Sequence, residues 1–548
     1  MSTIAATDAV AKKPKMLVLG GPHDYIEKIR RVGILEPGWN LFKYHFDVTM
    51  VMGDQDYAEV VEKHEPDIVL FDGGCDSFKG RYPTYINTHA HPEVPKVGFS
   101  RNDFHSPMRL NSCGRFEQWG VDAFFNDSWP LKGAPKAFAE RTFFIPRWVN
   151  DELFHDYGET KCIPVSMLGA GFLSSNFYPW RRRVAPKLIE NFPFFHAPRP
   201  MPRPHMVVGD AYARMINRSY FVVGCGGASR SLVSKLFEIP GARSILVTEN
   251  TEIVRDAGFV DGENCLLVDE HDVVDRIQYL LDHPDELEAL TERSYQFIHA
   301  RHTFRQRTQL REWLDLHKQL KPGERIIQTS MSKPLQRVSN NHVQTEFVPF
   351  ESTDIRVNLD RGFDALEARK YDKAIEIFES MVNTYHYMFE PQLGLGIAHL
   401  AKGNLTKAVV RFARNLNFQN GCHSRVEDPV NQAYFALCFL CAGDMPSAVK
   451  YAAREAQVRH PLLNAVRWLV ALKQPSLNQD DPFKDAARND LMTLNSLDPR
   501  RHRGFQDWLL HCVEILAGCK QMQLIQAIQD ADIFQAPSTQ SPPQRVSP

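Results

Sequence analysis

Glycine and serine residues follow a short apolar strand near the middle of the chain, in an arrangement that suits a bound anion. The sequence predicts, in this order, a strand at Tyr220–Gly224, a turn at Gly226 and Gly227, a helix that is capped by Ser229 or Ser231 and ends near Glu238, and a strand at Ser244–Thr248. Glycines let backbone N–H groups approach phosphate oxygens, and the N-terminus of a helix adds roughly half a positive charge. The stretch therefore predicts a phosphate site.

The N-terminal part of the chain alternates short apolar strands with segments of helix length. The six expected strands are Lys15–Leu19, Phe46–Met52, Asp67–Phe71, Lys96–Phe99, Val121–Phe125 and Arg141–Ile145. Such alternation predicts a parallel, doubly wound sheet, whose ligands bind beyond the carboxyl ends of its strands. Gly21 and His23 follow the first of these strands, and Asp103 and His105 follow the fourth. There His105 can hydrogen-bond to a substrate hydroxyl, with Asp103 or a backbone group fixing its tautomer.

The overall charge gives no reason to expect a nucleic-acid partner. The chain has 548 residues and a net charge of −2, whereas nucleic-acid binders usually carry a basic face. No apolar run reaches the roughly 18 residues of a membrane span, and Met1–Lys15 lacks the apolar centre of a signal peptide, so we expect a cytoplasmic protein. Cys438 and Cys441 form a C-x-x-C in an apolar helical run without a second pair or nearby histidines, which indicates helix core rather than a metal or redox site.

A series of short motifs occurs in one order in the second quarter of the chain. The motifs are Phe143–Phe154, Lys235–Glu238, Gly241–Ala242, Gly258–Phe259, Gly262–Asn264, His302–Phe304 and Arg307. Together they resemble the hinge and the C-terminal half of GT-B glycosyltransferases, in the "glycosyl transferases group 1" branch that includes the CgeB-like proteins. The resemblance extends over residues 15–320. It implies two Rossmann-like, doubly wound domains, at 15–155 and 156–320, of which the second binds a nucleotide sugar.

The resemblance also implies roles for single residues of the second domain. Glu238 corresponds to a glutamate that accepts hydrogen bonds from the donor's ribose, a task that suits a carboxylate because it can accept from two vicinal hydroxyls. Lys235 and one of the arginines near position 182 would neutralise the diphosphate. The candidate donor-binding residues are therefore Glu238, Lys235, Gly226, Gly227, Ser229 and Arg182.

Three further expectations concern the chemistry of transfer. Asp103 and His105 correspond to an Asp-x-His on the acceptor side. Arg230 stands where related retaining enzymes carry a first glutamate, which leaves the sugar-contacting residue unassigned. The absence of a D-x-D at a strand end predicts a reaction without a metal ion or other cofactor. Glu249 and Glu252, on the next loop, should matter less for a bare nucleotide.

Five pairs of residues recur at a spacing of 34 in the C-terminal part. The pairs are Gly362 and Gly396, Tyr371 and Leu405, Lys373 and Lys407, Ala374 and Ala408, and Phe378 and Phe412. This is the tetratricopeptide period, with small residues where paired helices touch. Tetratricopeptide-like repeats are therefore expected at 353–475, with a concave face that suits a partner protein, the alternative being a rigid spacer. The other expected parts are a disordered N-terminus at 1–14, a linker at 321–352, a helical cap at 476–533 and a disordered tail at 534–548.

The sequence thus predicts a glycosyltransferase that moves a hexosyl or related sugar from a nucleoside diphosphate to an unidentified glycan, protein or small-molecule acceptor. Retention of the anomeric configuration is what the resemblance implies. Two alternatives remain. The GT-B scaffold can be inactive and leave the function to repeats that bind a partner protein, an alternative that Arg230 favours. A nucleotide-sugar epimerase shares the two-lobed fold, but it needs no long repeat domain.

The acceptor side is tested by His105→Ala. We expect turnover to fall by about 10² to 10⁴, the usual contribution of a general acid or base, while donor affinity changes little. Steady-state kinetics for turnover and calorimetry for the bare nucleotide separate the two effects. Unaltered turnover would show that His105 has no catalytic role and is an ordinary surface or core histidine.

Overall fold

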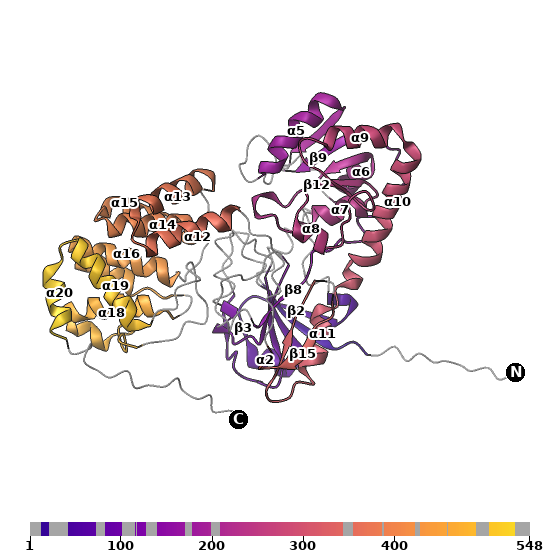
Figure 1. Cartoon of the computed structure of the whole chain (residues 1–548). Coiled ribbons are helices and arrows are strands. Elements are labelled where there is room, and N and C mark those ends of the chain that lie inside the picture. Colours follow the sequence, from indigo (N-terminus) through magenta and orange to yellow (C-terminus); the bar gives the residue numbers. More distant parts are fainter. Residues whose placement is uncertain are drawn as a thin grey trace. The chain divides into compact units, whose positions relative to one another are not determined.

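The computed structural model describes residues 12–20, 42–72, 83–100, 115–116, 118–127, 140–169, 178–198, 209–331, 333–342, 354–385, 388–421, 428–456, 459–488 and 504–531. The chain divides into two compact units. The first holds two parallel sheets with their helices, and the second holds stacked helices (Figure 1). The expected disordered ends, apart from residues 12 to 14, lie outside the described residues.

The first sheet has six parallel strands in the order β2-β1-β4-β6-β7-β8. Its strands are β1 (Lys15–Gly20), β2 (Asp47–Met52), β4 (Ile68–Asp72), β6 (Lys96–Ser100), β7 (Ala123–Asn126) and β8 (Thr142–Phe144). All six predicted strands are confirmed, and their ends differ from the prediction by at most two residues. A small two-stranded sheet, β3 (Gln55–Asp56) and β5 (Tyr85–Ile86), and helix α2 (Tyr57–His64) accompany them. Strand order reverses between β1 and β4.

The second sheet has five parallel strands in the order β10-β9-β11-β12-β13. The strands are β9 (Ile163–Gly169), β10 (Phe194–Pro198), β11 (Ser219–Val223), β12 (Ile245–Thr248) and β13 (Leu266–Leu267). The helices between and after them are α5 (Pro179–Asn191), α6 (Gly209–Asn217), α7 (Lys235–Gly241), α8 (Glu252–Asp256), α9 (Val273–Asp282) and α10 (Pro284–Arg301). The two strands predicted at 220–224 and 244–248 are confirmed as β11 and β12. Strands β9 and β11 are neighbours although β10 lies between them in sequence.

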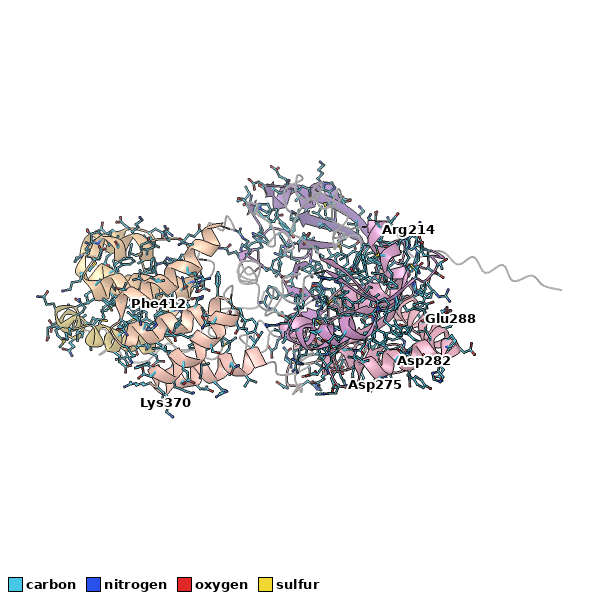
Figure 2. The ribbon with its side chains drawn as sticks, turned by 90° about the horizontal axis from the view of Figure 1, so that it is seen from above. Arg214, Asp275, Asp282, Glu288, Lys370 and Phe412 are labelled. Carbon is cyan, nitrogen blue, oxygen red and sulfur yellow. The ribbon has the colours of Figure 1, made fainter. Side chains whose placement is uncertain are left out.

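Helices cover both faces of the second sheet, because successive strand residues point to opposite sides and nearly all are apolar. Phe221 and Val223 pack in one core with α5, α9 and the first turns of α10. Val222 packs in another core with α6, α7, α8 and the last turns of α10. The outer surfaces of α9 and α10 carry acidic side chains such as Asp275 and Asp282 (Figure 2).

The chain returns to the first sheet after α10. Phe304 and helix α11 (Gln309–His317) pack in the core of the first sheet. Arg307 fixes this crossing. Its buried guanidinium donates to the carbonyl oxygens of Pro146 (2.9 Å), Arg147 (2.6 Å) and Arg301 (3.0 Å).

A β-hairpin occupies part of the segment predicted to be linker. Strands β14 (Glu324–Ile327) and β15 (Gln336–Ser339) pair antiparallel, and Ile326 and Leu335 are buried in the core of the first sheet. The Gln328 side chain accepts from the backbone N–H of Phe144 (2.7 Å) and donates to its carbonyl oxygen (2.9 Å). The linker prediction is therefore wrong for residues 324–339. It relied on the Pro, Gly and Ser residues of this segment and overlooked two short runs in which polar and apolar residues alternate.

The second unit contains stacked helices. They are α12 (Asp354–Glu367), α13 (Tyr371–Thr384), α14 (Phe389–Ala401), α15 (Leu405–Gly421), α16 (Pro429–Ala442), α17 (Met445–Ala452), α18 (Pro461–Lys473), α19 (Phe505–Gly518) and α20 (Met522–Gln529). Helix α19 packs against α14, α16 and α18. Of the described helices, none has both the length and the apolar character that crossing a membrane requires.

Glycines let these helices approach one another across aromatic rings. A Cβ atom at Gly362 would lie 2.6 Å from the ring of Phe378, and one at Gly396 would lie 2.6 Å from the ring of Phe412. The two contacts are spaced by the same 34 residues that the sequence showed. Phe412 is fully buried and lies among the helices of its unit, whereas the exposed Lys370 lies at their edge (Figure 2).

The separateness of the two units can be tested by deletion. Removing residues 351–548 should leave a soluble protein that still binds nucleotide, because the hairpin at 324–339 and both sheets are retained. Gel filtration, circular dichroism and thermal shift with nucleoside diphosphates measure this. The matched control removes residues 321–548 and exposes two cores by taking away the hairpin, so its Tm should fall by more than about 5 °C. Aggregation of the protein that lacks only residues 351–548 would contradict the expectation.

Candidate functional site

The carboxyl ends of β9 and β11 mark the place where a ligand is expected in the second sheet. From β9 the chain passes to β10 on one side, whereas β11, β12 and β13 follow on the other side. Parallel sheets bind ligands where the strand order reverses in this way, because the two diverging loops leave a crevice. The segments that meet there are Gly169, at the end of β9, and Gly224–Arg230, after β11.

The glycine turn after β11 is tightly folded. A Cβ atom at Gly226 would lie 2.4 Å from the carbonyl oxygen of Ser231, so no side chain fits there. Gly227 has a φ of +70°, and Arg230 ends the short 3-10 turn of residues 227–229 in the left-handed region with a φ of 47°. The backbone, rather than any side chain, therefore forms this part of the site.

The helix that was predicted to start at Ser229 or Ser231 starts only at Lys235. This prediction is wrong because the left-handed Arg230 and the extended residues after it interrupt the helical hydrogen bonds. Helix α7 has seven residues, and Pro240 and Gly241 bring it to an early end. Glu238 consequently lies near its first turn rather than at its far end. A helix dipole aimed at the glycine turn is no part of this site. The side chain of Ser229 lies outside the described residues.

Lys235 brings a positive charge to the end of β9. Its Nζ donates a hydrogen bond to the carbonyl oxygen of Leu168, and a Cβ atom at Gly169 would lie 2.5 Å from the same Nζ. Gly169 has a φ of +122°, which side chains rarely adopt. His196, in the middle of β10, hydrogen-bonds to the backbone of Gly169, and burial lowers the pKa of its ring. The lysine and a largely neutral histidine thus flank one glycine backbone.

Glu249 is the carboxylate of this edge of the sheet. It follows β12, it accepts a hydrogen bond from the N–H of Gly226, and its Oε1 is shielded from solvent without a partner among the described residues. Burial raises the pKa of its carboxyl to about 7, although Arg230, Arg183, Arg181 and the Gly226 N–H act in the opposite direction. The group therefore changes charge near neutral pH.

Of the three consecutive arginines on α5, Arg181 is the one that enters the site. It is 3 % exposed, stacks on the ring of Tyr178 at 4.4 Å and donates to the sulfur of Cys225. Its Nε is buried and has no hydrogen-bond partner among the described residues. Arg182, the candidate from the sequence, is exposed, and Arg183 forms an exposed ion pair with Glu270 at 2.9 Å.

Glu238 is engaged within the protein. The hydroxyl of Tyr212, on α6, donates to its Oε2 at 3.3 Å, and the Tyr212 ring packs edge-on against Phe154 at 6.0 Å. The side chain is half-buried. Two roles are compatible with this contact, namely orienting the carboxylate for a ligand and holding α6 to α7.

Four candidates of the first sheet fall outside the described residues. These are Gly21, His23, Asp103 and His105. Their roles stay predictions. In the described part of the chain, no group of three or more histidine, cysteine, aspartate or glutamate side chains is arranged to hold a metal ion.

Sequence reasoning chose Arg182 from a triple that includes Arg181, and it missed a site role for Glu249 and the approach of Lys235 to Gly169. A signal existed for Glu249, since it directly follows a buried parallel strand and so must lie at the ligand-binding edge. No local signal separates Arg181 from its two neighbours, because only the packing of α5 decides which arginine is buried. Arg181, Lys235 and the backbone N–H groups of the glycine turn provide positive charge and hydrogen-bond donors near the carboxyl ends of β9 and β11, which is an environment for a diphosphate.

Comparisons with known proteins find one family model and several solved structures that resemble part of the chain. Residues 162–315 match the family model described as "Glycosyl transferase-like". Similar solved structures include HepE from Anabaena in complex with UDP (12 % identity, TM-score 0.34, 56 % of this chain and 100 % of that chain). Sucrose-phosphate synthase from Thermosynechococcus elongatus is another (11 % identity, TM-score 0.35, 56 % and 98 %). A putative UDP-N-acetylglucosamine 2-epimerase from Listeria monocytogenes is a third (12 % identity, TM-score 0.30, 56 % and 96 %).

No curated protein matches the chain. The structural likenesses are too weak to establish a function, so the family match is the finding that bears on it. The segment that holds the second sheet is similar to the glycosyl transferase-like family. In the sequence it follows the first parallel sheet and precedes the stacked helices.

The raised pKa of Glu249 gives a pH dependence. Below about pH 7 the carboxyl is protonated, and above it a negative charge appears beside the expected diphosphate. Nucleoside diphosphate affinity should therefore fall as pH rises from 6 to 8, by about 5- to 10-fold, the equivalent of about 1 kcal/mol. In Glu249→Gln the part of this pH dependence that Glu249 causes should vanish, while ionisation of the ligand affects the wild type and the variant equally. Calorimetry at several pH values measures it, and identical profiles for both proteins would exclude Glu249 from the site.

Proposed function

We propose that this protein is a glycosyltransferase that transfers a sugar from a nucleoside diphosphate to an acceptor. One observation carries the proposal. The domain that matches the glycosyl transferase-like family, residues 162–315, has its strand order reversed between β9 and β11, and Lys235, Arg181 and the Gly226 backbone lie at that edge of the sheet. A nucleotide sugar needs such a set of groups, because its diphosphate carries the charge that they neutralise.

The diphosphate would bind between Gly169 and the glycine turn. Backbone N–H groups of the turn can approach its oxygens because Gly226 and Gly227 have no side chains, and Lys235 and Arg181 supply positive charge from two sides. The bond from the sugar's anomeric carbon to the diphosphate breaks as the bond to the acceptor oxygen forms. Cations that are already in place stabilise the charge that develops on the leaving diphosphate, without reorganisation at the moment of transfer.

Glu238 would bind the ribose of the donor. Its contact with Tyr212 restrains the side chain by a neighbouring helix. A carboxylate is the group that can accept from two vicinal ribose hydroxyls. Acceptor activation would fall to His105, with Asp103 as its orienting partner. We further propose that the reaction retains the anomeric configuration, needs no metal ion and takes place in the cytoplasm.

The stacked helices would act as a tetratricopeptide-like module that binds the acceptor protein or another partner protein. The equal spacing of the Gly362–Phe378 and Gly396–Phe412 contacts supports a structural repeat. Such modules bind peptides in the groove that stacked helix pairs form.

The test of the proposed function is nucleotide binding by Glu238 variants. Thermal-shift screening against nucleoside diphosphates and their sugars identifies the preferred donor, and calorimetry then gives its affinity. A hydrogen bond to a charged group contributes about 1.5 to 3 kcal/mol, so Glu238→Ala should weaken binding by roughly 10- to 150-fold, and Glu238→Gln should fall between.

Two matched variants complete the experiment. Tyr212→Phe removes the contact within the protein and keeps the carboxylate, so it should bind nearly as wild type if Glu238 serves the ribose. Glu252→Ala, at an exposed position on α8, should change nothing. Wild-type affinity in a folded Glu238→Ala protein would contradict the assignment of Glu238 to the ribose of the donor. A protein that binds no nucleotide and releases no diphosphate would favour the inactive scaffold.

A further inference from the structure

Four cysteines come together between two helices of the second unit. Cys438 and Cys441 lie on α16, and Cys512 and Cys519 lie on or directly after α19. The two helices pack against each other, and they lie side by side in Figure 1. The sequence interpretation of Cys438 and Cys441 assumed that no second pair was near, and this assumption is wrong because the fold brings the second pair from a distant segment.

Two of the four thiols are in direct contact. The thiol of Cys441 donates a hydrogen bond to the sulfur of Cys519, and Cys438 and Cys512 lie close enough to Cys441 to interact with it electrostatically. The backbone holds the contact in place, since the Gln521 side chain donates to the carbonyl oxygen of Cys441 at 2.8 Å. Three of the thiols are buried, and Cys519 is the partly exposed one.

The arrangement does not suit a metal ion. A structural zinc site needs four ligands that converge on one point at about 2.3 Å. Among the described residues no such group of ligands exists, this cluster included. A pair of thiols in contact, one of which is accessible, suits exchange with a disulfide instead.

We propose that Cys441 and Cys519 form a redox modification site, at which a low-molecular-weight disulfide such as oxidised glutathione converts the two thiols to a reversible internal disulfide. The cross-link joins α16 to the end of α19. Because α19 packs on α14, α16 and α18, the bond fixes the C-terminal helices on this face of the unit.

The chemistry proceeds in two exchanges. The Cys519 thiolate attacks one sulfur of oxidised glutathione, which forms a mixed disulfide and releases one glutathione thiolate. Cys441 then loses its proton to solvent and attacks the Cys519 sulfur, which forms the internal bond and releases the second glutathione thiolate. Two protein thiols are oxidised and one glutathione disulfide is reduced to two thiols, so atoms and electrons balance.

The order of attack follows from the surroundings of the two sulfurs. The hydrogen bond from Cys441 lowers the pKa of the Cys519 thiol, and the same contact together with burial raises the pKa of Cys441. Cys519 is therefore the thiol that meets the oxidant, because it is both more exposed and more readily ionised.

The experiment uses the folded full-length chain in glutathione redox buffers. Non-reducing peptide mapping by mass spectrometry should find Cys441 joined to Cys519, with a fraction that follows the ratio of oxidised to reduced glutathione and returns to zero with a reductant. The oxidised protein should melt about 5 to 15 °C higher in its helical unit, because the bond closes a long loop.

Variants decide the outcome. Cys519→Ser should abolish both the cross-linked peptide and the Tm shift, and it changes the more exposed position, where folding is least at risk. Cys162→Ser, at an exposed thiol of the first unit, should alter neither. The proposal fails if Cys519 remains as a mixed disulfide with glutathione. It also fails if the bond maps to another pair, or if the Cys519→Ser protein shows the same Tm shift as wild type.

Discussion

The guanidinium of Arg307 is the interaction on which the arrangement of the first unit depends. Its nitrogens donate to carbonyl oxygens of the segment that leads into the second sheet and of the end of α10, which leads out of it. His302 adds a nitrogen contact at 2.9 Å, and Val149 donates to its carbonyl oxygen at 2.8 Å. Burial lowers the pKa of Arg307 to about 9, which is the cost of holding a cation in the core. Carbonyl acceptors on both chain crossings offset that cost.

Strand order then determines where chemistry can occur. Because β9 and β11 are neighbours while the chain leaves them toward opposite sides of the sheet, a ligand is expected at their carboxyl ends. Two glycines without room for a side chain, Gly169 and Gly226, lie at these ends. Lys235, Arg181 and Glu249 come from three different elements, and they converge only because the parallel sheet aligns those elements at one edge.

The sequence predicted all six strands of the first sheet and the inner strands β11 and β12 of the second, since short apolar runs bounded by turn residues have few other structures available to them, but it did not predict β10 and β13. It failed where distant contacts decide. The helix after Gly227 was placed too early because Arg230 adopts a left-handed conformation that no propensity signals. The hairpin at 324–339 is stabilised by the first sheet's core, and the partners of Cys438 and Cys441 lie on a helix far along the chain. Glu249 could have been predicted, because it directly follows a strand and ligands bind beyond the carboxyl ends of parallel strands. Arg181 could not, because burial of one arginine among three is a property of packing.

In the helical unit, Phe378 meets glycines from two different helices. Cβ atoms at Gly362 on α12 and Gly394 on α14 would each lie within 2.6 Å of its ring. The thickness of a single benzene ring therefore sets the separation of three helices. Stacked helices form a superhelix whose curvature depends on such separations. The ring thus sets the spacing of the helices in the array. A larger residue at either glycine would change the pitch of the superhelix, and with it the way in which successive helices meet an extended ligand.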